Sequence, residues 1–163
     1  MRPRAPASPP VIGILGGVAS GKSLIARQLE DLGAVVLDAD RAGHEVLHEP
    51  AVKAALRTRW GDAVFGTDGA VNRAAVGRIV FASPPAGPEE LKFLERLTHP
   101  RITQRLREQM AAATAGGAKA IVLDAAVMLK AGWNRLCDAV WFVDVPIKVD
   151  VAVGDNWAEV EPM

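Results

Sequence analysis

The sequence predicts an α/β fold: a parallel sheet of about four strands with helices on both faces. Three observations lead to this prediction. Four short apolar runs are bounded by glycine, proline or aspartate, helical patterns separate them, and a glycine-rich loop joins the first run to the first helical pattern. Short apolar runs between turn residues are typical of buried parallel strands. Strands that alternate with helices form right-handed crossovers within one sheet.

The first crossover has the clearest pattern. Val11–Leu15 (VIGIL) is the first predicted strand, and Ala34–Asp38 (AVVLD) is the second. Between them a helical pattern covers Lys22–Leu32 and stops at Gly33, because glycine readily ends a helix. The apolar residues of this helix share one face, at Ile25, Leu29 and Leu32.

The stretch 41–113 is too long for one crossover helix, so we expect an inserted helical substrate lobe there. The first predicted element is a helical stretch over 41–60 that breaks or restarts at Pro50. A helix over Arg73–Phe81, capped by Asn72, and a loop over Ser83–Pro88 follow. A helix over 89–98 and a further helix with Pro100 in its first turn complete the stretch. The third and fourth strands follow at Ala120–Asp124 and Ala139–Val145.

The bulk composition narrows the class of protein. The 163 residues include 19 basic and 19 acidic side chains, and this zero net charge argues against non-specific nucleic-acid binding. The single cysteine, Cys137, allows no intramolecular disulfide and fits a reducing compartment. No apolar run approaches the roughly 18 residues of a membrane span. We expect a flexible leader (1–10), one domain (11–146), a cytoplasmic location, and no nucleic-acid or membrane partner.

The glycine-rich loop matches the pattern G-x-x-x-x-G-K-[ST] between a strand and a helix. Such a loop turns its backbone N–H groups toward phosphates, and the start of the following helix adds positive potential. In this context Lys22 would reach the β- and γ-phosphates of ATP, and the Ser23 hydroxyl would bind Mg²⁺. The alternative is a chance match. The predicted nucleotide-binding residues are Gly16, Gly17, Val18, Ala19, Ser20, Gly21, Lys22 and Ser23.

Three aspartates follow predicted strands. The carboxyl ends of parallel strands form the ligand crevice, so Asp38, Asp40 and Asp124 would face the phosphate loop. A kinase needs a carboxylate to orient or deprotonate the acceptor hydroxyl, a role that we give to Asp40. Asp124 would hold Mg²⁺ or its water. The alternatives are a solvated loop carboxylate or a helix cap. By itself, His99 fits a capping or packing histidine, and Arg73 fits a solvated side chain.

With these residues identified, the chain resembles the dephospho-CoA kinase family. The matching pieces are GGVASGKS, LGAVVLDAD followed by His44, VNRAAVGRIVF, LERLTHPRI and IVLDAAVMLKAGW…CDAVWFVDVP, in order from Val11 to Pro146. The resemblance implies a P-loop kinase-like fold and transfer of phosphate from ATP, with Mg²⁺, to the ribose 3′-hydroxyl of dephospho-coenzyme A, the last step of coenzyme A biosynthesis. It also implies that Asp40 is the catalytic base and that Arg73 and His99 lie at the acceptor or phosphate site.

The sequence departs from the family pattern in two places. Ala126 and Lys130 stand where the family has proline and an acidic residue, and 147–163 carries neither an arginine-bearing lid nor a last strand. From this atypical tail we expect a chain that binds phosphates but is a weak or inactive kinase. Two alternatives stay open. One is a non-catalytic nucleotide-binding remnant. The other is a different small-molecule kinase such as shikimate kinase, which the absence of a glycine triplet after the third strand disfavours.

Overall fold

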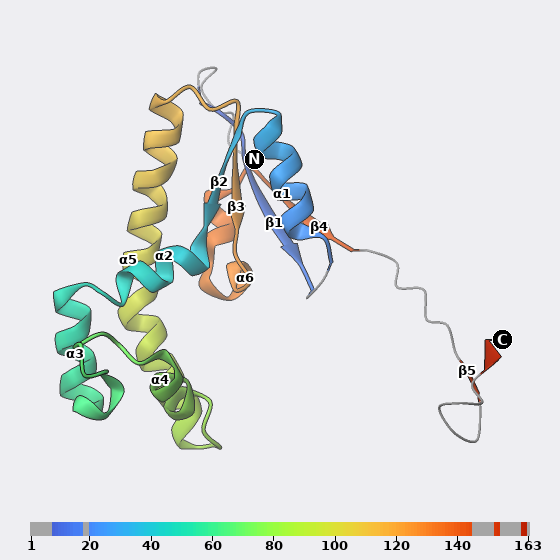
Figure 1. Cartoon of the computed structure of the whole chain (residues 1–163). Coiled ribbons are helices and arrows are strands. Elements are labelled where there is room, and N and C mark those ends of the chain that lie inside the picture. The colour runs from blue at the N-terminus through green and yellow to red at the C-terminus, as the bar shows by residue number, and fades with distance from the viewer. Residues whose placement is uncertain (1–7, 18–19, 145–151, 154–160, 163) are drawn as a thin grey trace.

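The computed structural model describes residues 8–17, 20–144, 152–153 and 161–162. Its centre is a four-stranded parallel sheet with the strand order β2-β3-β1-β4 (Figure 1), which confirms the predicted α/β class. The strands are β1 (Val11–Gly16), β2 (Ala34–Asp38), β3 (Ala120–Asp124) and β4 (Ala139–Val143). The fourth strand ends earlier than predicted: Asp144 lies outside it, and Val145 lies outside the described residues.

The two faces of the sheet bury separate apolar clusters. Helix α1 (Lys22–Asp31) covers one face, where Ile14, Ala26 and Val122 are buried. On the other face Ile121 and Leu123 pack into a larger cluster that extends into the helices. Fully burying such side chains stabilises the fold by about 1.5–3 kcal/mol each. The prediction of one apolar face on α1 is wrong at its last member, because Leu32 is the C-cap of α1 and is 68% exposed.

The stretch between β2 and β3 is helical (Figure 1). It consists of α2 (Ala39–Val46), α3 (Pro50–Trp60), the short 3₁₀ helix η1 (Asp62–Val64), α4 (Arg73–Val80) and α5 (Ala86–Ala115). Helices α3 and α4 pack around the first half of α5 below the sheet, and the second half of α5 runs beside the sheet. The expected cap is confirmed, since the Asn72 side chain accepts a hydrogen bond from the Ala75 amide.

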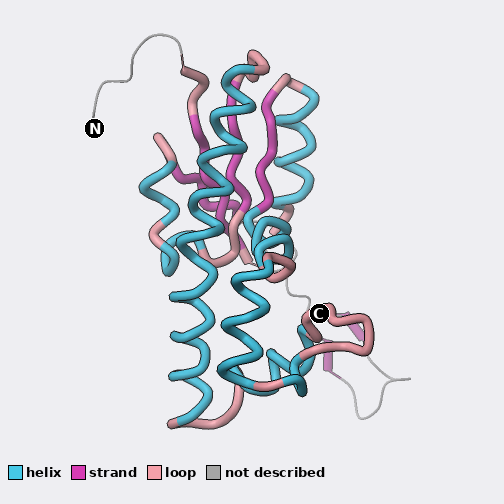
Figure 2. The backbone as a smooth tube through the Cα atoms, turned by 90° about the vertical axis from the view of Figure 1, so that its left-hand side faces the viewer, coloured by secondary structure: helices cyan, strands magenta, loops and turns pink. Residues whose placement is uncertain are grey.

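Helix α5 is continuous (Figure 2), so the prediction of two helices that meet at Pro100 is wrong. Proline inside a helix removes one backbone hydrogen bond and clashes with the preceding turn. The missing bond is the one from residue 100 to the Arg96 carbonyl, and the neighbouring Leu97 carbonyl accepts from Arg101 Nη1 at 2.6 Å. Burial of Ile102 and Leu106 holds the helix on the core. The predicted loop over Ser83–Pro88 is also shorter, because α5 begins at Ala86.

Ion pairs join α2 to α5 beside the sheet. The Arg105 guanidinium contacts Glu45 Oε2 at 2.7 Å and Glu49 Oε1 at 3.1 Å. The hydrogen bond from Arg105 is the main reason that the pKa of Glu45 is lowered. These side chains are about one-third exposed, so each pair contributes modestly to stability. Their effect on the site is geometric: they set the position of α2, the helix that carries Asp40.

The remaining elements are short. After β3 come α6 (Met128–Ala131) and the 3₁₀ helix η2 (Trp133–Leu136), and the two-residue strands β5 (Ala152–Val153) and β6 (Glu161–Pro162) pair antiparallel. The rest of the predicted tail, 147–163, lies outside the described residues. Within the described ranges, no helix is both long and apolar enough to cross a membrane.

Candidate active site

The glycine loop, Gly16–Ser23, connects the end of β1 to the start of α1. Two of its positions require glycine. A Cβ at Gly16 would lie 2.5 Å from both Ser20 Oγ and the Val143 carbonyl oxygen, and Gly21 has a φ of 88°. Val18 and Ala19 lie outside the described residues. The loop therefore has the tight turn that its sequence pattern predicted, with α1 starting directly after it.

Lys22 and Ser23 form the first turn of α1. Lys22 Nζ donates to the carbonyls of Gly16 at 2.8 Å and Gly17 at 3.1 Å, which holds the ammonium group against the loop. The Ser23 residue is exposed, and the Ser20 hydroxyl is buried with no hydrogen-bond partner in the described part of the chain. The loop thus presents a cation and a buried hydroxyl that has no partner, both suited to phosphate oxygens.

The three predicted aspartates come together at the carboxyl edge of the sheet, but in different roles. Asp38 Oδ1 accepts a hydrogen bond from the Arg41 amide at 2.9 Å, so Asp38 is the N-cap of α2. Asp40 is exposed in the first turn of that helix. Burial raises the pKa of Asp124; the nearby charges of Asp38 and Asp40 raise it further, and Lys22 opposes them. The charges of Asp124 and Lys22 are therefore close enough to interact.

An interhelical pocket of about 410 Å³ opens between α2, α4, α5 and the segment after β3. Its polar lining consists of Asp40, His44, Arg73, Glu95, Thr98 and His99. Leu94, Ile102 and Trp133 supply apolar walls. The predicted residues Asp40, Arg73 and His99 thus meet in one cavity, although 59 positions separate the first from the last. A pocket with apolar walls and a few polar groups is the usual form of a small-molecule site.

His99 is fixed by its neighbours in the pocket wall. Its ring lies 5.5 Å from that of Trp133, and Trp133 Nε1 donates to Thr103 Oγ1 at 2.9 Å. The Thr103 hydroxyl in turn donates to the His99 carbonyl at 2.8 Å. Burial lowers the pKa of His99, an effect that Lys130 reinforces and Glu95 opposes, so the ring is neutral at neutral pH.

Arg73 and Glu95 complete the charged lining. Arg73, the first residue of α4, makes no ion pair with any described residue and leaves its guanidinium free to face the pocket. Glu95 accepts from Lys130 Nζ at 2.5 Å. Sequence reasoning missed Glu95 and also Trp133, which is 2% exposed and lines the pocket. The signal for Glu95 was its position one helical turn before His99.

A phosphate-type loop after β1, carboxylates at the ends of β2 and β3, and a pocket in the adjoining helices define a P-loop kinase-like protein. A family model described as dephospho-CoA kinase matches residues 10–154. The chain belongs to the dephospho-CoA kinase family.

Named relatives agree with this assignment, and a solved structure shares the fold. The chain is 35% identical to a dephospho-CoA kinase from Dehalococcoides mccartyi over 83% of its length, and 37% identical to one from Carboxydothermus hydrogenoformans over 84%. A crystal structure of a Thermus thermophilus protein superposes with a TM-score of 0.71 at 30% identity, covering 85% of this chain and 67% of that one. The chain spans about two thirds of the curated relatives' length, 67% and 65% respectively.

Proposed function

We propose that this protein transfers a phosphoryl group from ATP to the ribose 3′-hydroxyl of dephospho-coenzyme A, the last step of coenzyme A biosynthesis. The observation that carries the proposal is the position of Asp40. Its carboxyl group lines the interhelical pocket, and its charge acts on Asp124, which in turn is a neighbour of Lys22. Asp40 thus stands between an acceptor pocket and a phosphate loop, where a group that orients the acceptor hydroxyl is needed.

The features of the loop support ATP as the donor. Gly16 packs so closely against Ser20 and the Val143 carbonyl that a Cβ would clash, which keeps the loop tight, and Ser20 Oγ is a buried donor without a partner among the described residues. Lys22 can exchange its contacts with the loop carbonyls for contacts with phosphate oxygens, because an ammonium group has three donors. Its charge would then stabilise the negative charge that spreads over the transferring phosphoryl group.

The oxygen donors near the loop also fit Mg²⁺. Ser23 and Asp124 offer a hydroxyl and a half-buried carboxylate, which are hard ligands of the kind that Mg²⁺ prefers. The described residues contain no cluster of three or more metal-binding side chains, so nucleotide phosphates and water would complete the coordination. When bound, the ion would neutralise phosphate charge at the transfer site.

The chemistry then follows from the protein side chains. Asp40 would accept the proton of the 3′-hydroxyl and hold that oxygen in line with the γ-phosphate. Arg73 would place its guanidinium against phosphate oxygens at the transfer site. His99, neutral and held against Trp133, would position the acceptor as a hydrogen-bond partner rather than as a charge.

A coupled assay with ATP, Mg²⁺ and dephospho-coenzyme A tests the function, with calorimetry of ATP binding in parallel. We expect ATP-dependent formation of coenzyme A, at the low rate that the atypical tail predicts, and no turnover of shikimate. ATP binding without turnover of either acceptor would identify a non-catalytic nucleotide-binding protein and would refute the proposal.

A further inference from the structure

A second cavity of about 410 Å³, here named the α5 groove, adjoins the interhelical pocket. Its lining consists of Lys92, Glu95, Arg96, His99 and Pro100, all on α5. Two of these, Glu95 and His99, also line the interhelical pocket. Successive residues of a helix are turned by about 100°, so the two cavities occupy adjacent faces of α5 and share the Glu95–His99 boundary. A ligand in one cavity can therefore extend into the other.

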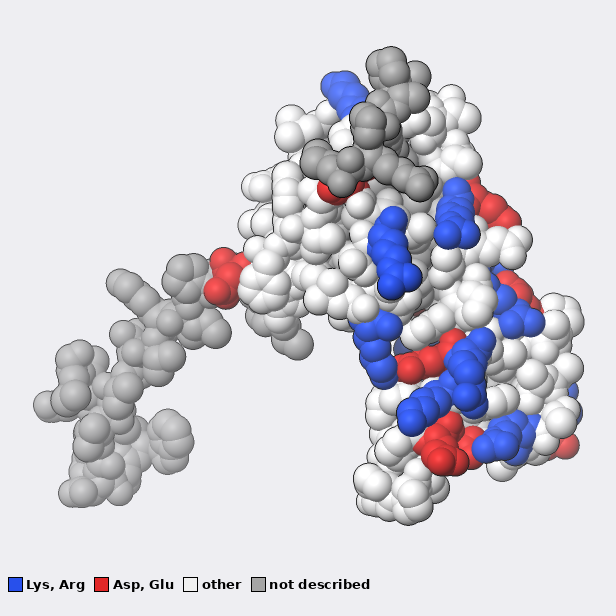
Figure 3. Space-filling model, turned by 180° about the vertical axis from the view of Figure 1, so that it is seen from behind, with Lys and Arg blue, Asp and Glu red and all other residues white. Residues whose placement is uncertain are grey.

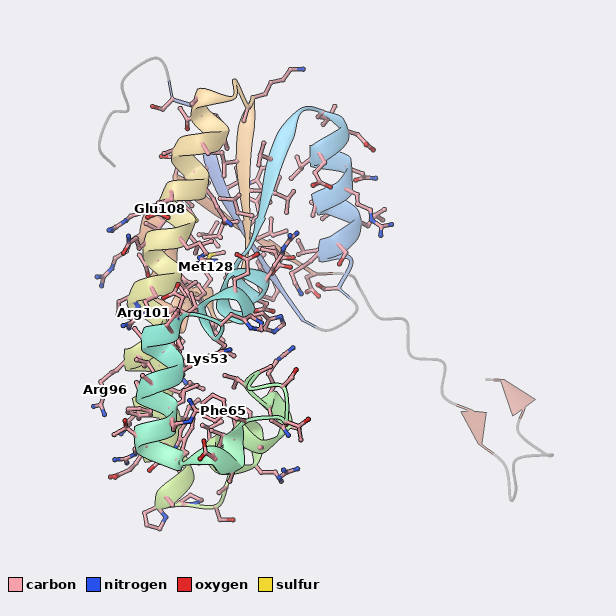
Figure 4. The ribbon with its side chains drawn as sticks, turned by 60° about the vertical axis from the view of Figure 1, so that its left-hand side comes forward. Lys53, Phe65, Arg96, Arg101, Glu108 and Met128 are labelled. Atoms are coloured by element: carbon pink, nitrogen blue, oxygen red, sulfur yellow. The ribbon has the colours of Figure 1, made fainter. Side chains whose placement is uncertain are left out.

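The α5 groove is cationic. Lys92 and Arg96 are exposed and have neither an ion pair nor a side-chain hydrogen bond within the described part of the chain. In Figure 4, Arg96 points away from the body of the protein. The carboxylate of Glu95 is already neutralised by Lys130 at 2.5 Å. Because His99 is neutral, the groove keeps two uncompensated positive charges, one helical turn apart.

In contrast to Lys92 and Arg96, most charged side chains near the α5 groove form ion pairs. Arg59 pairs with Glu90 at 2.7 Å, and Arg105 pairs with Glu45 and Glu49. Figure 3 shows this mixture of basic and acidic side chains over the helical part of one face. Free cations that line a cavity next to a proposed active site suit a ligand with two negative charges. A phosphodiester-linked diphosphate carries about that charge at neutral pH.

We propose that the α5 groove binds the 5′-diphosphate arm of the acceptor nucleotide. This inference rests on the proposed function, which requires an acceptor whose ribose hydroxyl lies at Asp40. With the ribose in the interhelical pocket, the 5′ side would pass the Glu95–His99 boundary, and the diphosphate would lie between Lys92 and Arg96. A smaller cavity of about 200 Å³, lined by His44, Leu47, His48, Val71 and Arg73, is the other exit from the pocket. This smaller cavity has about half the volume of the α5 groove, and Arg73 is the one permanent cation in its lining.

The test compares two acceptors that differ only in the arm. Binding of dephospho-coenzyme A is measured by calorimetry, and binding of adenosine, which has the ribose but no diphosphate, by ligand-observed NMR. The test variant is Lys92→Gln/Arg96→Gln. The matched control is Arg107→Gln, which removes an exposed cation from a similar face of α5, away from both cavities.

We expect the double variant to bind dephospho-coenzyme A about tenfold more weakly or worse, because two charge-assisted contacts are lost. Adenosine and ATP should bind as they do to the unmodified chain, and Arg107→Gln should change nothing. Unchanged affinity for dephospho-coenzyme A in the double variant overturns the inference but leaves the proposed function intact. Loss of affinity in His48→Gln instead would put the arm in the smaller cavity, because His48 lines that cavity and not the interhelical pocket. Failure of the unmodified chain to bind dephospho-coenzyme A would overturn both proposals.

Discussion

Asp38 and Asp124 are register partners at the carboxyl ends of the neighbouring parallel strands β2 and β3. The two carboxylates have different surroundings. Asp38 caps α2 through the Arg41 amide, whereas Asp124 is half-buried with Lys22 nearby. The cap on Asp38 fixes the first turn of α2, and Asp40 in that turn faces the interhelical pocket. The ends of β2 and β3 thus connect the phosphate loop, through Asp124 and Lys22, to the interhelical pocket, through Asp38 and Asp40.

Replacing Lys22 by alanine should strongly weaken ATP binding with little effect on the fold. Its ammonium group lies against the loop carbonyls of Gly16 and Gly17 and is not part of the core. Calorimetry with Mg²⁺ present measures the affinity, and thermal unfolding measures the fold. Arg27→Ala, which removes an exposed cation from the same helix, is the control and should bind ATP normally. Normal ATP affinity in Lys22→Ala would rule out the loop as the phosphate site.

Asp40→Asn should lower turnover by about 10²–10⁴-fold, the usual cost of losing a general base, while ATP binding is retained. The amide has the size of the carboxyl group but does not accept the proton in the same way. Steady-state kinetics with dephospho-coenzyme A gives the rate, and Asp31→Asn, an exposed carboxylate at the end of α1, serves as the control. Turnover at the normal rate would mean that another group is the base.

Asp38→Ala should destabilise the fold by about 0.5–2 kcal/mol, the range measured for loss of an N-cap side chain. Turnover should fall as well, because the first turn of α2 positions Asp40. Urea unfolding measures the change in free energy. Asp38→Asn keeps an oxygen that can accept from the Arg41 amide and should recover most of the stability. Equal losses in both variants would show that the charge, and not the cap, is what stabilises α2.

Asp124→Asn should stabilise the nucleotide-free protein at neutral pH and impair Mg²⁺-dependent ATP binding. Burial raises the pKa of Asp124 in the folded chain, so the folded state binds this proton more tightly than the unfolded state does. Stability therefore falls as the pH rises from the ordinary aspartate pKa through the raised value, and the penalty persists above it.

The asparagine variant should lack that part of the pH dependence. Unfolding curves between about pH 3 and pH 7 test this, since ordinary aspartate titrates near pH 4. Asp31→Asn, at an exposed carboxylate away from the site, is the control for the substitution itself. A variant that is less stable than the unmodified chain at pH 7 would mean that the Asp124 charge is compensated by Lys22.

Local features of the sequence were enough for the elements that depend on neighbouring residues. The glycine loop, the helix that follows it and the Asn72 cap are written in a few consecutive residues, because their hydrogen bonds close within one turn. The four apolar runs likewise predicted the four parallel strands, although β4 is exposed over its first four residues. Pro100 shows where this reasoning fails. Its local preference for a helix start was overridden by burial of Ile102 and Leu106 on the core.

Local sequence patterns thus predicted the α/β class, the phosphate loop and Asp40, whereas Arg73 and His99 were predicted from the family resemblance. Tertiary packing brings Asp40, Arg73 and His99 into one cavity and adds Glu95 and Trp133 to its lining. The reason is physical: hydrogen bonds in turns and caps depend on neighbours along the chain, whereas a cavity is the space left when distant helices pack. No local pattern specifies how α2, α4 and α5 meet, since that geometry depends on the apolar core they bury together.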